Sequence, residues 1–225
     1  MFIGHYAVAL SAKKIAPGTS LGTFFLATSF ADLLWPIFLL LGIEHVRIAP
    51  GITLMTPFDF YDYPYSHSLG MLLFWSALFG GILYAYRRNL SAALIVGGCV
   101  FSHWILDFVV HRPDLPLYPG GSVFVGLGLW NSRLGTYLLE LSMFLGGAWM
   151  YATSTAAKST RGNLGYWSFI GFLLIVYFLS FATPPPPSVG ALAIGGEVGA
   201  ILIVFIAYWI DKHRVPVAAR SAPAP

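Results

Sequence analysis

Residues 90–112 read LSAALIVGGCVFSHWILDFVVHR, an apolar run of membrane-spanning length with three polar residues near its end. His103, Asp107 and His111 follow one another at intervals of four residues. On a helix this spacing places all three on one face, about 6 Å apart from one turn to the next. Because a carboxylate between two imidazoles is costly in a membrane, the stretch predicts both a spanning helix and a candidate site.

The composition of the whole chain is that of an integral membrane protein. Of its 225 residues, 57% are hydrophobic and 9% are charged, whereas soluble domains carry about 25% charged residues. The net charge of +3 is small, and such an excess is typical of loops beside anionic lipid rather than of direct nucleic-acid binding. Cys99 is the only cysteine, so no internal disulfide is possible.

Six apolar segments are long enough to cross a hydrocarbon layer of about 30 Å. They are residues 20–43, 68–86, 90–110, 132–152, 166–182 and 189–210. Clusters of Pro and Gly, such as YDYPYS, RPDLPLYPGG and TPPPPS, separate several of them and predict loops outside the bilayer core. We therefore expect an all-α fold, a polytopic helical membrane bundle of about six transmembrane helices.

The two ends of the chain differ from these spans. The first twelve residues, MFIGHYAVALSA, are apolar but too short to span, and they predict a short N-terminal helix that enters the bundle from the cytoplasmic face. Residues 215–225, VPVAARSAPAP, show no apolar periodicity and predict a disordered tail. The single helical membrane domain is therefore expected to cover residues 1–214.

Basic residues predict the orientation of the bundle. Nine of them fall on one side of a six-span arrangement, namely Lys13, Lys14, Arg87, Arg88, Lys158, Arg161, Lys212, Arg214 and Arg220. The other side has only Arg47, Arg112 and Arg133. By the positive-inside rule both termini are expected in the cytoplasm, and the two long loops face the other side of the membrane.

Ionisable residues of several spans are predicted to share one layer, the outer half of the bilayer. A rise of about 1.5 Å per residue places them about 6–16 Å below the outer ends of their spans. They are Asp32, His103, Asp107, Glu140 and Glu197. His67 stands at the outer mouth of the second span, and His5 lies about 12 Å inward from Lys13, near the level of Asp32.

This layer has the residue types of a catalytic metal site, in which His and carboxylate ligands leave a position open for water. His103 and Asp107 would supply two ligands from consecutive turns, and His5, Asp32 and His67 would add ligands from other segments, for one or two ions. Without a nearby thiolate, the donors favour zinc, manganese or iron over soft copper sites. The plainer interpretation is an ordinary i,i+4 pair, with Glu140 and Glu197 as protonated neighbours.

Several short motifs occur in the order of a known family. They are GH at 4–5, FADLLWP around Asp32, YSHSLGM around His67, and HWILDFVVH from 103 to 111. Over residues 1–112 the chain resembles the bacterial LexA-binding, inner-membrane-associated metal-dependent hydrolases, which are distantly similar to zinc-dependent phospholipase C. The resemblance implies a bacterial inner-membrane protein with His5, Asp32, His67, His103 and Asp107 as metal-binding residues and His111 nearby.

Two classes of function follow from these observations. The first is a metal-dependent hydrolase of an ester or phosphoester, with zinc as the expected ion and a lipid or lipid-linked substrate. Asp32 or Glu140 would act as general base, His111 as proton shuttle and Arg112 as phosphate-binding residue. The second is a non-catalytic membrane subunit or scaffold with a membrane-protein partner, or a proton-coupled transporter-like protein, in which the buried carboxylates pair or carry protons.

Overall fold

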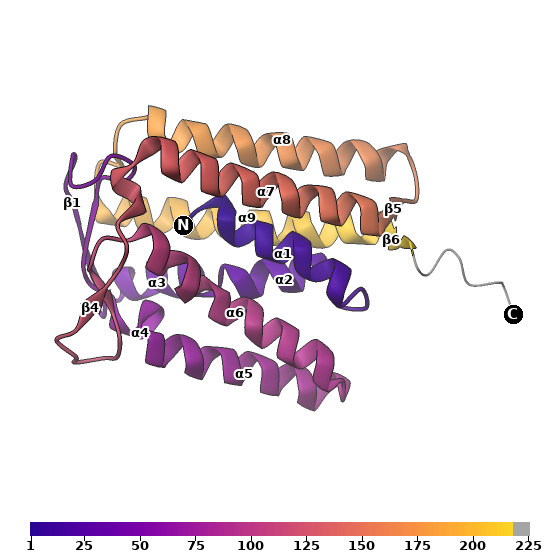
Figure 1. Ribbon diagram of the computed structural model, residues 1–225, viewed down its shortest axis with the longest axis horizontal. Coiled ribbons are helices and arrows are strands. Elements are labelled where there is room, and N and C mark those ends of the chain that lie inside the picture. Colours follow the sequence, from indigo (N-terminus) through magenta and orange to yellow (C-terminus); the bar gives the residue numbers. More distant parts are fainter. Residues whose placement is uncertain (218–225) are drawn as a thin grey trace, which may run out of the picture.

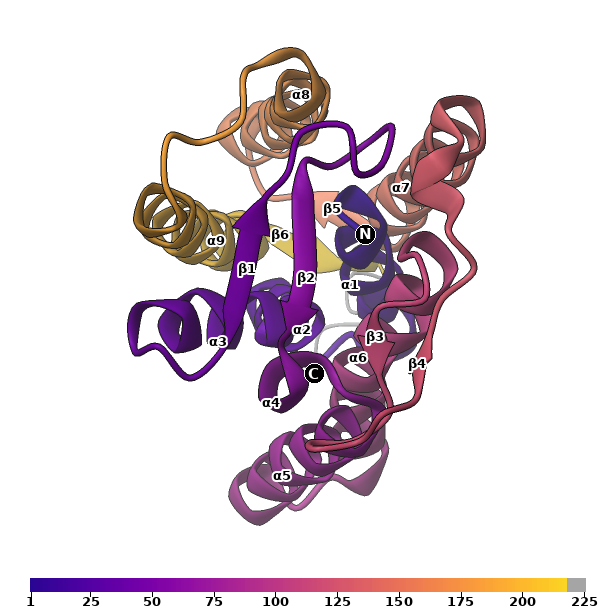
Figure 2. The same cartoon turned by 90° about the vertical axis from the view of Figure 1, so that its left-hand side faces the viewer.

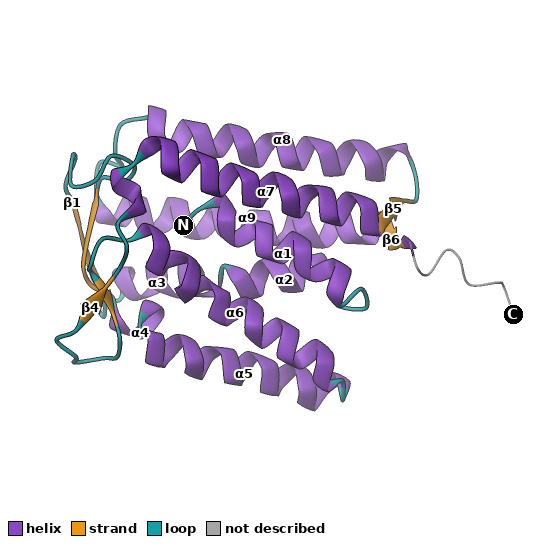
Figure 3. Ribbon diagram, viewed as in Figure 1, coloured by secondary structure: helices purple, strands orange, loops and turns teal. Residues whose placement is uncertain are grey.

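The computed structural model describes residues 1–217, and in this part of the chain the fold is all-α (Figure 3). The helices, labelled in Figure 1, are α1 (Ile3–Ile15), α2 (Leu21–Thr28), α3 (Phe30–Leu40), α4 (Pro64–His67), α5 (Leu69–Arg87), α6 (Leu90–Val110), the 3-10 turn η1 (Leu129–Asn131), α7 (Arg133–Ser154), α8 (Thr160–Ala182) and α9 (Val189–Lys212). A side chain caps the first turn of each of α2, α5, α6, α7, α8 and α9. The capping residues are, in that order, Ser20, Ser68, Asn89, Ser132, Ser159 and Ser188. Short polar residues thus mark where these helices begin.

Short strands pair in the connections between helices. The antiparallel pairs are β1 (His45–Ile48) with β2 (Phe58–Asp62), β3 (Leu115–Pro116) with β4 (Phe124–Val125), and β5 (Thr155–Ala157) with β6 (Arg214–Pro216). The last pair ties the α7–α8 connection to the chain after α9. Val215 and Pro216, where we expected a disordered tail to start, therefore belong to a strand, and residues 218–225 of that tail lie outside the described residues.

Four described helices are long and apolar enough to cross a membrane: α5, α6, α8 and α9. α5 suits contact with lipid, because it buries only Leu72 and exposes apolar side chains such as Phe74 and Ile82. The expected span 132–152 corresponds to α7, which is helical but does not meet the same criterion and carries Arg133 and Glu140. The expected first span, 20–43, is two helices, α2 and α3.

α2 and α3 meet at a bend of 52° around Ser29 and together count as one further candidate span or a re-entrant segment. The last carbonyls of a helix lack helical donors. The carbonyl of Thr28, at the end of α2, accepts a hydrogen bond from Nδ1 of His103 on α6 at 2.8 Å. The bend therefore gives a buried histidine a fixed backbone partner.

α1 lies inside the bundle, packed against α7, α2 and α6 (Figure 1). Nine of its thirteen residues are buried. Small residues permit the close approach to α7, since a Cβ added at Gly147 would lie 2.6 Å from the carbonyl oxygen of Ala7. The amino end of α1 is thereby held beside the second half of α6.

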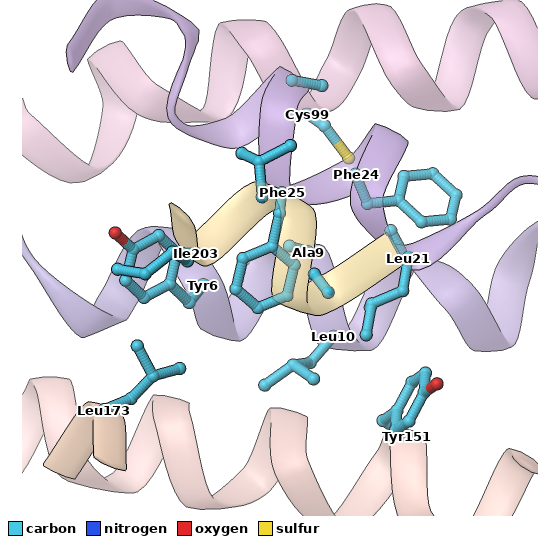
Figure 4. Close-up of a cluster of buried hydrophobic side chains, with 14 of the residues drawn as sticks. Tyr6, Ala9, Leu10, Leu21, Phe24, Phe25, Cys99, Tyr151, Leu173 and Ile203 are labelled. Atoms are coloured by element: carbon cyan, nitrogen blue, oxygen red, sulfur yellow. The ribbon is translucent and has the colours of Figure 1, made fainter. Parts of the chain in front are cut away.

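The main core is formed by α1 and α2 together with residues of α6, α7, α8 and α9. Figure 4 shows Leu10, Phe25, Leu173 and Ile203 pointing toward one another from these helices. Such contacts hold a bundle together mainly by dispersion where lipid replaces water outside. The core is apolar, so the polar cluster described below is confined to one end of the molecule.

The β1–β2 hairpin crosses that end of the bundle (Figure 2). The hairpin packs on the bundle through a second apolar cluster, which consists of Trp35 of α3, Val46 of β1, Tyr63 and Leu115. β2 leads directly into the single turn of α4, which returns the chain to the bundle at His67. The hairpin thus covers one end of the bundle and places a histidine beneath itself.

Candidate metal centre

His103 and Asp107 form the centre of a buried polar cluster. They lie one turn apart on α6, with 3.1 Å between Nε2 of His103 and Oδ2 of Asp107. Their side chains are 1% and 3% exposed. The predicted pair on one helical face is therefore present, and it lies out of contact with bulk solvent.

α1, α3 and α4 bring three further side chains to this pair. The ring of His5 stacks on that of His103 at 3.8 Å between centroids, and its Nε2 lies 3.1 Å from Oδ1 of Asp107. Nε2 of His67 lies 3.6 Å from Oδ1 of Asp32 and 3.8 Å from Oδ2 of Asp107. All five residues expected to bind metal thus meet in one place.

Two groups in this cluster have the geometry to hold a metal ion. They are His5, His103 and Asp107, and Asp32, His67 and His103. In each group one ligand atom per residue lies within 4.8 Å of the others. His103 belongs to both groups, so its protonation decides what the cluster can bind.

The hydrogen bond of His103 fixes its tautomer. Nδ1 faces the carbonyl of Thr28, which only accepts, so this nitrogen carries the proton and Nε2 of the neutral ring has a free lone pair. Nε2 is buried and makes no hydrogen bond among the described residues, although Oδ1 of Asp32 lies at 3.7 Å and a carboxylate oxygen of Asp107 is closer still. The lone pair of the neutral His103 ring thus faces two carboxylates, and a cation placed between these three groups would bind to all of them.

His67 is held in the same tautomer through Ser66 and Glu44. The hydroxyl of Ser66 donates to Oε2 of Glu44 at 2.5 Å, so it must accept from Nδ1 of His67 at 2.7 Å. Glu44 also accepts from the backbone amides of Tyr65 and Ser66, and burial raises the pKa of its carboxyl group. In the neutral ring the lone pair is then on Nε2, which faces Asp32 and Asp107. Such outer partners commonly orient metal-binding histidines.

The donor set therefore fits a divalent cation. Oδ1 of Asp107 contacts the amino group of Met1, while Oδ2 faces the histidines. Converging acceptors in a buried site are costly unless a positive charge lies between them. Because Nδ1 of His103 is committed to Thr28, its single free lone pair serves only one of the two groups at a time. The geometry favours one ion in this arrangement over two.

His111 lies at the rim of the cluster as the residue that ends α6. Its Nε2 is 3.9 Å from Oδ2 of Asp107, and its Nδ1 lies 3.0 Å from Oδ1 of Asp114. The hydroxyl of Tyr63 donates to the same oxygen of Asp114, and burial lowers the pKa of the imidazole. Sequence reasoning missed Asp114, although HRPD contains the i,i+3 spacing that pairs the two.

Glu140 has a structural task that the sequence did not indicate. Its Oε2 accepts from the backbone amides of Phe2 and Gly4 at 2.9 and 3.3 Å, which caps the amino end of α1. Its Oε1 is buried without a hydrogen-bond partner among the described residues. Glu140 therefore positions α1, and through it His5. Glu197, on α9, shows no interaction with the cluster within the described range.

Arg112 does not present a free guanidinium group. It contacts Asp59, and its Nε lies 2.9 Å from Oδ2 of Asp114. Asp59 also pairs with Arg47 at 3.2 Å. The expectation that Arg112 binds a substrate phosphate is not supported, because two carboxylates already occupy this side chain.

A cavity of about 880 Å³ opens onto the cluster. Asp32, His67, Asp107 and His111 form part of its wall. Most of the remaining wall is apolar and comes from α3, the β1–β2 hairpin, the start of α7 and the α8–α9 connection. The candidate metal centre is thus accessible to a molecule much larger than water.

Comparison with protein-family models, curated proteins and solved structures gives no match.

Proposed function

We propose that this protein is an integral membrane, metal-dependent hydrolase that cleaves an ester or phosphoester. The observation that carries the proposal is the convergence of the Nε2 atoms of His67 and His103 on the carboxylates of Asp32 and Asp107. This arrangement opens onto a largely apolar cavity. Nε2 of His103 is buried and has no hydrogen-bond partner among the described residues, and a metal ligand requires an imidazole nitrogen without a proton.

His67, His103, Asp32 and Asp107 would hold the ion, with His5 as a further ligand or a neighbour of Asp107. Nitrogen and oxygen donors without a thiolate favour zinc among the biological divalent ions. A bound divalent ion lowers the pKa of water and polarises the bond to be cleaved. The residues around the ion then determine where protons go.

Asp32 and His111 are placed for proton transfer. The Asp32 side chain is 44% exposed toward the cavity, unlike Asp107, so it can accept a proton from water if it does not bind the ion. His111 has Nδ1 held by Asp114 and Nε2 directed to the cluster, which suits transfer of a proton to the leaving group. Glu140 acts through α1 and is not the general base in this account.

The proposed location is the bacterial inner membrane, with both termini in the cytoplasm. The distribution of basic residues supports this orientation. The site then lies in the outer half of the bilayer. The resemblance to the LexA-binding, inner-membrane-associated hydrolases supports the same interpretation.

Hydrolysis by the full-length protein in detergent tests the proposal. A fluorogenic ester and a fluorogenic phosphodiester with the same acyl chain would be compared for wild type, Asp107→Asn and Asp62→Asn. Asp62 is an exposed carboxylate on β2 and serves as the control. We expect Asp107→Asn to lower one of the two activities by more than about a hundredfold and Asp62→Asn to leave it unchanged. Equal rates in all three proteins would instead favour a non-catalytic subunit or a transporter-like protein.

A further inference from the structure

The cavity combines a largely apolar wall with an arginine at its edge. Trp35, Phe60, Trp130 and Phe181 line it, and the first three lie beside the rings of His67 or His111. Arg133, the first residue of α7, also lines it and is exposed. A cavity of this composition suits a molecule with an apolar part and a negative charge.

Arg133 differs from the other two cations at the hairpin end. Arg47 and Arg112 are both paired with Asp59. The one hydrogen bond of Arg133 within residues 1–217 is from Nε to the carbonyl of Leu54, at 3.4 Å, and no carboxylate there lies within ion-pair distance. Its charge is therefore available to a ligand in the cavity.

Small residues form the wall where α9 begins. Ala191, Gly195 and Gly196 line the cavity and are exposed. A Cβ added at Gly195 or Gly196 would meet nothing within 4 Å. The exposed apolar side chains of Ile194 and Val198 lie on the same part of the helix. Gly195 and Gly196 thus leave room for an apolar chain along this part of α9, next to the apolar side chains of Ala191 and Leu192.

We propose that the cavity binds an anionic amphiphile of the phospholipid class, with Arg133 as the residue that selects its negative charge. The apolar chains lie along the Gly195–Gly196 wall, and the linkage between head and chains faces Asp32 and His67. This inference rests on the proposed hydrolase function and names its substrate class. It replaces Arg112, which is paired, by Arg133 as the anion-binding side chain.

Native mass spectrometry of the purified, detergent-solubilised protein tests the charge selection. The probes are dioleoyl phosphatidylglycerol, dioleoyl phosphatidylcholine and glycerol 3-phosphate, which is a phosphate anion without acyl chains. We expect wild type to bind the anionic lipid about tenfold more tightly than the zwitterionic one, as one charge-assisted contact allows. Arg133→Gln should abolish this preference. Arg47→Gln, which removes a paired charge at the same end, should keep it.

A second pair of variants tests the path of the chains. Gly196→Leu should weaken binding of both lipids by about fivefold or more, because the added side chain occupies the cavity. Gly199→Leu is the control, since its position on α9 is equally open but does not line the cavity. Both substitutions favour helix formation, so a loss confined to Gly196→Leu is not a folding effect.

The inference is overturned if wild type shows no charge preference, if Arg133→Gln and Arg47→Gln behave alike, or if glycerol 3-phosphate binds as tightly as the anionic lipid. Metal content measured on the same samples separates the two proposals. A protein that contains metal but lacks lipid preference contradicts this inference alone. A protein that lacks metal but selects anionic lipid through Arg133 contradicts the hydrolase proposal and leaves the amphiphile site standing.

Discussion

The two ends of the bundle both bury charged side chains, but they do so differently. At the end where α1 and α9 finish, Nζ of Lys13 lies 2.8 Å from Asp211 and donates to the carbonyl of Thr19. At the hairpin end, the lone pairs of His67 and His103 face the carboxylates of Asp32 and Asp107. The first end pairs a cation with a carboxylate. At the second end the amino group of Met1 contacts one oxygen of Asp107, and the other oxygen of Asp107 and Oδ1 of Asp32 face imidazole nitrogens.

This difference distinguishes a structural polar network from a binding site. A buried ion pair that satisfies itself needs no ligand, and its removal affects stability. The cluster held in place by Thr28, Ser66 and Glu44 gains stability from a bound cation beyond the contact of Asp107 with the amino group of Met1. Substitutions at the two ends should therefore have separable consequences.

The largest expected effect on stability is at the Lys13 end. Lys13→Met leaves the mostly buried carboxylate of Asp211 without its cation, so the free energy of unfolding should fall by about 3 kcal/mol. Denaturant unfolding in detergent measures this change. The double variant Lys13→Met/Asp211→Leu should recover most of the loss, and metal content should stay at the wild-type level throughout. Loss of metal in Lys13→Met would contradict the separation of the two ends.

Removal of metal should produce the next largest effect, at the hairpin end. Binding at 100 times the dissociation constant contributes about 2.7 kcal/mol to stability. We therefore expect a strong chelator to lower the melting temperature of wild type and zinc to restore it. His103→Ala should melt at the same temperature with and without the chelator. An identical response in wild type and His103→Ala would show that the chelator acts elsewhere.

Glu44→Gln tests the support of His67. The amide can still accept a hydrogen bond from Ser66 but lacks the negative charge that orients the relay, by which we mean the hydrogen bonds from His67 to Ser66 and from Ser66 to Glu44. The metal affinity should therefore fall by about 10–100-fold. Competition with a chromogenic zinc chelator measures the affinity. Glu197→Gln, a carboxylate on α9 away from the cluster, is the matched control and should leave the affinity unchanged. If both variants bind like wild type, the Ser66–Glu44 relay has no influence on the metal.

Arg112→Gln should have the smallest effect. The side chain is 35% exposed and paired with carboxylates outside the cavity, so the stability change should be below about 1 kcal/mol. Hydrolysis should change by less than about threefold, which corresponds to well under 1 kcal/mol. Loss of the preference for anionic lipid in Arg112→Gln, as expected for Arg133→Gln, would restore Arg112 as a substrate-binding residue.

Regular features of the fold were accessible from the sequence. The predicted span 90–110 coincides with α6, and those at 68–86 and 189–210 differ from α5 and α9 by two residues at most. Apolar length is sufficient for such helices. The bend at Ser29 was not predicted, because apolarity is continuous from α2 to α3 and the break depends on packing against other helices.

The sequence predicted the candidate metal-binding residues but not the residues that hold them in place. His5, Asp32, His67, His103 and Asp107 are rare polar residues in apolar surroundings, so each was visible in the sequence. Glu44 and Asp114 lie in polar loops, where carboxylates are ordinary. Their roles depend on how the hairpin and the end of α6 fold back. The capping role of Glu140 likewise requires α1 to lie against α7.

Elemental analysis of the purified full-length protein tests the central claim most directly. After expression in metal-replete medium, the account predicts about one equivalent of a divalent metal in wild type and in His213→Ala, a histidine at the opposite end. His103→Ala should contain less than about 0.2 equivalents. Wild type with less than about 0.2 equivalents, or His103→Ala with as much metal as wild type, would contradict the assignment of this cluster as a metal centre.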